Sequence, residues 1–205
     1  ELPGSIITKD SDLEPYREVY VNAWKYIKRA IKYADDNDIG VLIDMHGAYG
    51  SQNAQPHSGV NNGKADFFND FNENKMTKLL VWLVQELEDV SNVIGIELLN
   101  EPHNTKRLWK WYSRTMDAMR KAQTKSRDMP LYFHDAFSPS QGAEFASKRN
   151  DFVVQDTHSY FVYTQQDRDM SASKHTSHIE GQVQESMSKL ADKARGNMVV
   201  GEWSC

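Results

Sequence analysis

The chain has 205 residues, of which 24 are Lys or Arg and 29 are Asp or Glu, and its net charge is −5 at pH 7. This length allows one domain with a hydrophobic core, and the absence of a basic cluster argues against nucleic acid as a partner. No apolar run approaches the roughly 18 residues of a membrane-spanning helix. Residues 1–4 (ELPG) do not resemble a signal peptide, although a chain that begins without Met is compatible with a processed product. Cys205 is the single cysteine and has no internal disulfide partner, so cysteine usage does not indicate a compartment.

The first half of the chain alternates between helix and strand patterns. Apolar residues recur at helical spacing over residues 16–36, and a short apolar run at 41–46 has the length of a strand. A loop rich in Gly, Asn, Ser and Gln extends from there to about residue 66. A second helix is predicted over residues 75–90 and a second strand over 93–99.

The second half continues this alternation. A third helix over residues 107–126 precedes strands at 131–135 and 152–158. A helix over 178–194, ended by Gly196, precedes a fifth strand at 198–203. Apolar strands separated by helices are typical of a parallel sheet covered by helices. The five strands alone are compatible with a doubly wound sheet and with a closed barrel.

Polar residues at the carboxyl ends of the strands favour the barrel. They are Asp44, His46, Asn100, Glu101, His134, Asp135, His158, Tyr160 and Glu202. In a (β/α)8 barrel all these ends share one face, and that face holds the active site. A doubly wound sheet usually has a Gly-rich phosphate loop after its first strand, and residues 46–51 (HGAYGS) match no such motif. We therefore predict an α/β fold of the (β/α)8 TIM-barrel type.

Two glutamates in this set suggest a reaction. Glycoside hydrolysis needs one protonated and one ionised carboxyl group on opposite sides of the anomeric carbon. Glu101 and Glu202 end two different strands, so a barrel would bring both to its mouth. Two carboxyls that lie close together cannot both ionise easily, which keeps one of them an acid. Position alone leaves a chance placement of two glutamates equally open.

Local motifs favour the catalytic interpretation. Residues 94–102 (IGIELLNEP) resemble the acid/base strand of glycoside hydrolase family 5, and residues 199–204 (VVGEWS) resemble its nucleophile strand. Residues 44–53 (DMHGAYGSQN) resemble the third strand and loop of the fungal exo-β-1,3-glucanases in that family, and residues 158–160 (HSY) match its His-x-Tyr motif. The resemblance covers most of the chain and is weakest over about residues 10–32 and 164–196.

The resemblance implies a role for each matching residue. Glu101 would be the acid/base and Glu202 the nucleophile that forms a glycosyl-enzyme intermediate. Asn100 would bind the sugar 2-hydroxyl and His46 the sugar of the −1 subsite. His158 would orient the acid/base or the sugar. Tyr160, in this scheme, would hydrogen-bond the nucleophile.

The remaining polar and aromatic residues have weaker assignments. Asp44 is expected to make a structural ion pair or hydrogen bond, and His134 and Asp135 to support the site. Tyr163 and Phe161 follow the strand at 152–158, where they could stack on a sugar, and Trp203 is ambiguous. The tryptophans at helical positions are expected to be core or helix-packing residues; they are Trp24, Trp82, Trp109 and Trp111.

The sequence departs from the resembled family in two ways. Gln55 stands near a position where the exo-glucanases have a Phe of an aromatic clamp, so the preference of the positive subsites is open. The five strands correspond to about strands 3 to 7 of a barrel, so residues 1–205 are expected to be part of a catalytic domain whose first, second and eighth strands are not present. The family's second-strand Arg and eighth-strand Trp accordingly have no counterpart here. Because an open sheet exposes two apolar edges, we expect a fragment, or a chain completed by another.

Several alternatives remain open at this point. Another family 5 glycanase (a cellulase, β-1,6-glucanase or glycolipid glucosidase) fits the same motifs, as does a truncated, inactive glucan-binding fragment. A metal-dependent hydrolase could use Asp44, His46, His134 and His158 as ligands, but it would leave both glutamate motifs without a role. The favoured prediction is an exo-β-1,3-glucanase that needs no cofactor or metal. Its partner would be a β-glucan or oligosaccharide, and the resemblance implies secretion or a cell-wall location.

Overall fold

The computed structural model describes residues 17–60, 62–124 and 128–204. Its centre is a five-stranded parallel sheet in which the spatial order β1-β2-β3-β4-β5 follows the chain. The strands are Val41–Asp44, Val93–Glu97, Leu131–His134, Val153–Tyr160 and Met198–Ser204. Because every neighbouring pair is parallel, all five carboxyl ends lie at the same edge of the sheet. The predicted α/β class and all five predicted strands are therefore confirmed, with ends shifted by a few residues.

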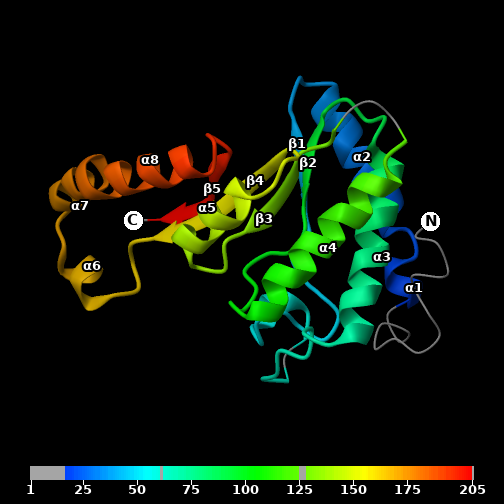
Figure 1. Ribbon diagram of the computed structural model, residues 1–205, viewed down its shortest axis with the longest axis horizontal. Coiled ribbons are helices and arrows are strands. Elements are labelled where there is room, and N and C mark those ends of the chain that lie inside the picture. Colours follow the sequence, from blue (N-terminus) through cyan, green and yellow to red (C-terminus); the bar gives the residue numbers. More distant parts are fainter. Residues whose placement is uncertain (1–16, 61, 125–127, 205) are drawn as a thin grey trace.

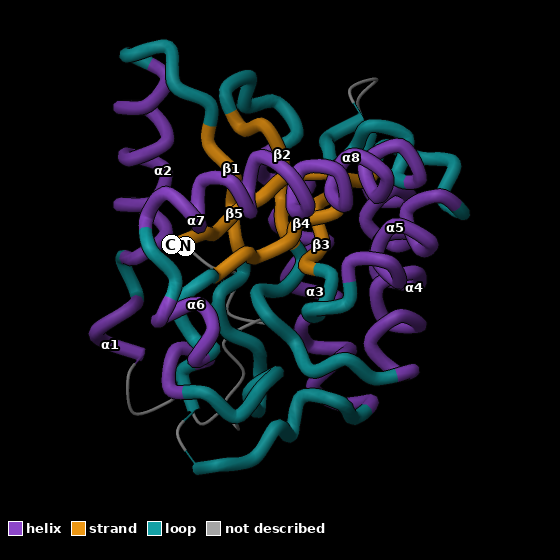
Figure 2. Tube along the Cα trace, turned by 90° about the vertical axis from the view of Figure 1, so that its left-hand side faces the viewer, coloured by secondary structure: helices purple, strands orange, loops and turns teal. Residues whose placement is uncertain are grey.

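Helices surround the strands (Figure 2). On one side, α3 (Asp70–Leu87) and α4 (Lys106–Ala122) run side by side (Figure 1). Helix α2 (Ala23–Asp35), which follows the short α1 (Arg17–Tyr20), packs on α3 through the rings of Trp24 and Trp82. Side chains cap both long helices, since Asn69 accepts a hydrogen bond from the backbone N–H of Asn72 and Thr105 from that of Leu108. None of the described helices is both long and apolar enough to cross a membrane.

The core lies between the sheet and the α3–α4 pair. Trp111 and Tyr112 on α4 and Leu80 on α3 are fully buried, as are Ile96 on β2 and Phe133 on β3. Helix packing also explains the tryptophans. Trp24 and Trp111 are both buried, whereas Trp82 and Trp109 are partly buried and pack against the core. The prediction that these four are core or helix-packing residues is confirmed.

The helical predictions need correction. The helix expected over residues 16–36 is two helices, because a turn at residues 21–22 separates α1 from α2; residue 16 lies outside the described residues. Helix α5 (Pro139–Ser147) was not predicted. The last helical region also begins earlier than predicted, with α6 (Gln165–Asp169), α7 (Ala172–His178), a π-helical turn (Ile179–Val183) and α8 (Gln184–Lys193).

The last strand is more exposed than the central strands. Within the described residues β5 pairs only with β4. Val199, Val200 and Trp203 of β5 keep 37%, 41% and 71% of their surface exposed, whereas Ile96, Leu131 and Phe133 of β2 and β3 keep none. The sheet is therefore well covered at its centre and open at its β5 edge.

Candidate active site

The two predicted glutamates lie in one cavity at the carboxyl ends of the strands. This cavity has a volume of about 710 Å³, and its wall includes Glu101 after β2, His158 and Tyr160 at the end of β4, and Glu202 on β5. Parallel pairing accounts for this convergence, because the β4–β5 register places His158 directly beside Glu202. Four of the six predicted site residues therefore share one wall.

Glu101 is held in place by the loop that follows β1. The side-chain amide of Asn53 donates to the Glu101 carbonyl oxygen at 2.9 Å. The buried amide of Gln52 donates to the carbonyl oxygens of His46 (3.0 Å) and Asn100 (2.9 Å). These bonds support the left-handed backbone of Glu101, whose φ is 43°, a conformation that is rare for a residue with a side chain. The loop thus fixes the direction in which the Glu101 side chain leaves β2.

His46 and Asn100 are close to the cavity but are not part of its wall. His46 Nδ1 lies 2.6 Å from the Asp44 carboxylate, and its Nε2 lies 3.3 Å from the Asn100 amide nitrogen. With Nδ1 donating to Asp44, Nε2 is the acceptor for Asn100. The expected structural hydrogen bond of Asp44 is thereby confirmed. The sugar-binding roles of His46 and Asn100 stay predictions.

His158 contacts both glutamates. Its Nδ1 lies 2.7 Å from Oε1 of Glu101 and 3.5 Å from Oε2 of Glu202, and its Nε2 lies 3.3 Å from Oδ2 of Asp156. Burial by itself lowers the pKa of His158, but the hydrogen bonds with Asp156 and Glu101 outweigh it and raise this pKa to about 9. His158 is therefore a cation at neutral pH, set between three carboxylates.

Tyr160 donates a hydrogen bond from its hydroxyl to Oε2 of Glu202. This bond raises the pKa of the Tyr160 phenol to about 12, so the hydroxyl keeps its proton at neutral pH. Glu202 thus accepts one hydrogen bond from Tyr160 and faces the cation of His158. Both contacts hold the Glu202 side chain at the cavity wall.

His134 lies beside this group and bears on the metal hypothesis. Glu101, His134 and His158 offer potential ligand atoms within 4.8 Å of one another. The backbone N–H of Ala136, however, donates to Nδ1 of His134, which places the ring proton on Nε2. Burial and the neighbouring His158 lower the pKa of His134 to about 3, so the ring is neutral. Both of its nitrogens are then unsuited to a metal ion, one engaged and the other protonated, and the donor set does not fit a metal centre.

The cavity wall also contains residues that the sequence did not single out. The Nε2 atom of His57, in the 3-10 helix Pro56–Ser58, lies 2.9 Å from the Asn53 amide and 3.6 Å from Oε2 of Glu101. Phe137 lines the cavity with 60% of its surface exposed. Tyr163 and Gln55 also line it, whereas Phe161 and Trp203 do not. His57 follows a Pro in a polar loop, and no motif or periodicity marks such a position in the sequence.

Two acidic side chains that share one cavity at the carboxyl edge of a parallel α/β sheet fit the arrangement of a barrel-type glycosidase. The sequence matches the family described as "Cellulase (glycosyl hydrolase family 5)" over residues 5–205. The chain belongs to glycosyl hydrolase family 5.

Proteins of similar sequence support the family assignment. Glucan 1,3-beta-glucosidase 3 of Schizosaccharomyces pombe is 30% identical over 100% of the chain and 43% of its own length. Probable glucan 1,3-beta-glucosidase A of Emericella nidulans is 31% identical over 94% of the chain and 46% of its own length. The chain thus spans less than half of these curated relatives.

Solved structures support the fold. A rutinosidase from Aspergillus niger superimposes with a TM-score of 0.67 at 17% identity, covering 89% of the chain and 54% of its own. The endoglucanase Cel5A of Pseudomonas stutzeri gives 0.62 at 17% identity, with 88% and 56% covered. At such identities the likeness concerns the fold alone. The five strands are half of a TIM barrel, which confirms the predicted fold class.

Proposed function

We propose that the chain carries the catalytic carboxylates of a retaining β-glycosidase, with Glu202 as nucleophile and Glu101 as acid/base. The observation that carries this proposal is the contact of His158 Nδ1 with both side chains. Since the two contacts measure 2.7 and 3.5 Å, the nearest oxygens of Glu101 and Glu202 are at most about 6.2 Å apart, a bound that accommodates the roughly 5–5.5 Å between the carboxyls of retaining enzymes. This proximity supports a nucleophile that attacks carbon directly.

The proposed reaction has two displacements. Glu202 forms a bond to the anomeric carbon while the glycosidic C–O bond breaks and a proton passes to the leaving oxygen. Because Glu101 and His158 lie 2.7 Å apart, this proton belongs to the pair rather than to either residue alone. In the second step water attacks the same carbon, the Glu101–His158 pair accepts its proton, and the bond to Glu202 breaks.

For the substrate we propose a β-1,3-glucan from which glucose is released at the chain end. The support is the name shared by two relatives that are 30% and 31% identical, together with the loop at residues 50–53. Gln55, where those glucanases were expected to have a Phe, lines the cavity. Subsite preference therefore rests on Tyr163 and Phe137, the exposed aromatic residues of the wall. Secretion or a cell-wall location stays a prediction.

Two substitutions test the roles of the glutamates, in the protein produced from its complete reading frame. Glu202→Ala should abolish hydrolysis of both an aryl β-glucoside and laminari-oligosaccharides, because no glycosyl-enzyme forms. Glu101→Ala should lower kcat/KM for the oligosaccharides about 10²–10⁴-fold. On the aryl glucoside the same variant should give a burst of phenol followed by slow turnover, since that leaving group needs no proton. Glu144→Ala, at an exposed glutamate on α5, is the control.

Azide separates the two roles further. It needs no general base, so it should speed turnover of Glu101→Ala and yield the β-glucosyl azide. It should not rescue Glu202→Ala in that way. Identical behaviour of both variants, without azide rescue on the β face, would show that the assignment is wrong.

A further inference from the structure

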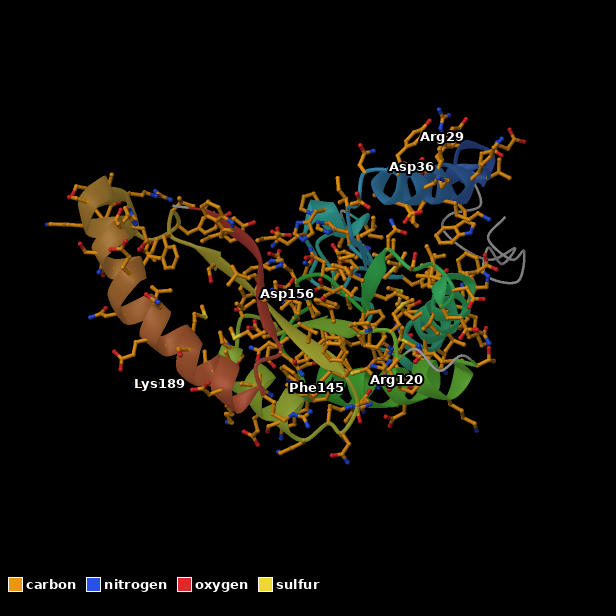
Figure 3. The ribbon with its side chains drawn as sticks, turned by 90° about the horizontal axis from the view of Figure 1, so that it is seen from above. Arg29, Asp36, Arg120, Phe145, Asp156 and Lys189 are labelled. Carbon is orange, nitrogen blue, oxygen red and sulfur yellow. The ribbon has the colours of Figure 1, made fainter. Side chains whose placement is uncertain are left out.

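Asp156 is a buried carboxylate that the proposed mechanism does not use. It lies on β4 with only 2% of its surface exposed, and Figure 3 labels it near the middle of the sheet, where β4 and β5 lie side by side. It precedes His158 by two residues, so both side chains leave the same face of the strand. It is not part of the cavity wall among the described residues.

The two carboxylate oxygens of Asp156 contact residues of two different strands. Oδ2 lies 3.3 Å from Nε2 of His158 on β4, and Oδ1 accepts a hydrogen bond of 2.7 Å from the backbone N–H of Gly201 on β5. Gly201 has to lack a side chain here, because a Cβ atom would lie 2.3 Å from Oδ2 of Asp156. The glycine before Glu202 is therefore explained by the carboxylate that occupies its side-chain space.

These contacts reach both proposed catalytic residues. Through His158, Asp156 is one side chain away from Glu101, and through Gly201 it is one peptide bond away from Glu202. We propose that Asp156 is a positioning residue that holds His158 protonated and fixes the β5 backbone, and so sets the geometry of both carboxylates. The inference rests on the proposed function of Glu101 and Glu202.

The groups that face Asp156 from other strands explain why its partner is a histidine cation. Burial and the neighbouring Asp156 raise the pKa of Glu97 on β2 well above its usual range. The remaining acidic groups whose charges act on Asp156 or His158, or on Glu97 beside them, come from four positions: Asp44, Glu101, Asp135 and Glu202. His134, on β3, is neutral. The proton of His158 thus offsets an otherwise acidic interior.

The charge of His158 is measured most directly by its NMR titration. In the wild-type protein both ring nitrogens of His158 should show imidazolium shifts at pH 7.5, and a neutral ring at that pH would overturn the proposal without any variant. In Asp156→Asn the amide keeps an acceptor for Gly201 but loses the charge. The midpoint of His158 should then fall by about 1–3 pH units. An unchanged midpoint contradicts the proposal.

Asp135→Asn is the matched control. Asp135 is also fully buried at the carboxyl end of a strand, but it receives hydrogen bonds from Gln155, Thr157 and the backbone of Phe137 rather than contacting His158. Its substitution should move the His158 midpoint far less than Asp156→Asn does. Equal shifts in both variants would mean that general burial of charge, rather than the contact of Asp156, holds the proton.

Kinetics test the catalytic consequence. Because the Glu101–His158 pair keeps its proton to higher pH while Asp156 is charged, Asp156→Asn should move the alkaline limb of kcat/KM to lower pH. It should lower kcat more than it changes KM, since Asp156 does not line the cavity. An unchanged pH profile despite a shifted titration overturns the positioning role. A wild-type protein without glycosidase activity refutes the proposed function instead, and the titration still decides whether Asp156 sets the charge of His158.

Discussion

At the scale of single residues, Arg120 and Arg149 connect the segments before the central strands to a partly buried carboxylate, Asp151. Arg120 on α4 donates to the backbone oxygens of Met129 (2.5 Å) and Phe152 (2.6 Å), which precede β3 and β4. Asp151 accepts from both Arg120 (2.9 Å) and Arg149 (2.7 Å), and all three side chains are less than a fifth exposed. This group ties α4 to the amino ends of two central strands, opposite the cavity.

The Asp151 group predicts a pH dependence. Burial alone would raise the pKa of Asp151, but hydrogen bonds from Arg149 and Arg120 lower it from 3.8 to about 2. A lowered pKa stabilises the fold above pH 3.8, and this contribution is lost as the pH falls through about 2. Urea unfolding should show Asp151→Asn to be less stable than wild type by about 1–2 kcal/mol at pH 6, after allowance for partial solvent screening.

The difference between wild type and Asp151→Asn should shrink towards zero near pH 2. Glu144→Gln removes an exposed pair with Lys148 and should change the free energy of unfolding little at either pH. A difference between wild type and Asp151→Asn that is the same at both pH values would contradict this account.

The same scale shows what the sequence could and could not indicate. Glu101, His158 and Glu202 were predictable, because each ends a strand within a recognisable motif. Asp156 and Glu97 lie inside apolar strands, and nothing in the sequence tells that they face each other across the sheet. His57 lies near Glu101 only because of the path that the polar loop after β1 takes in the folded chain. Contacts of this kind depend on tertiary structure and have no local pattern.

At the scale of elements, close contact between strands constrains glycine positions. Gly95 in the middle of β2 faces the ring of Tyr132 on β3, and a Cβ atom there would lie 2.3 Å from the ring and 2.8 Å from the carbonyl oxygen of Pro130. The neighbouring backbone cannot move away without disturbing the β2–β3 pairing. Gly95 is therefore required by packing, although its φ angle is ordinary.

Gly95→Ala should lower the free energy of unfolding by about 1–3 kcal/mol, the usual range for overpacking. Gly181 offers a matched control, because it lies in a helical segment and a Cβ atom there would meet nothing within 4 Å. Gly181→Ala should be neutral or slightly stabilising. Chemical denaturation of both variants checks the pair, and equal losses of stability would rule out the steric explanation.

Elements also show why the helix boundaries were harder to predict than the strands. Helix α5 is short and buries only the small residues Gly142, Ala143 and Ala146, so its apolar spacing is too weak to recognise. Helix α3 begins at Asp70 rather than residue 75, because the cap at Asn69 precedes the periodic residues. All five strands were predicted from the sequence, since a continuous apolar run is a stronger signal than weak helical spacing.

At the scale of the whole molecule, the sheet has an unpaired edge at β5 within the described residues. Val199, Val200 and Trp203 expose apolar surface there together with unpaired backbone groups. Such an edge favours pairing with another chain. The relatives are more than twice as long as the chain, so a covering segment has a precedent in the family.

The 205-residue chain by itself should accordingly self-associate as its concentration rises. Val200→Lys places a charge on the β5 edge and should reduce this association in sedimentation velocity experiments. Val19→Lys is the control, because this exposed valine lies in α1 and not in β5. It should leave the association unchanged. Association that both variants reduce equally would reflect net charge rather than the strand edge.

The position of the proposed nucleophile on this edge strand separates the stability of the site from that of the core. Glu101 follows β2, which is paired on both sides, whereas Glu202 depends on β5 staying paired to β4. Opening of β5 alone would release Gly201 from Asp156 and carry Glu202 away, while the α3–α4 core remained folded. Catalytic competence would then be lost and regained through a local equilibrium, at temperatures where spectroscopic measures of the helices still report a native protein.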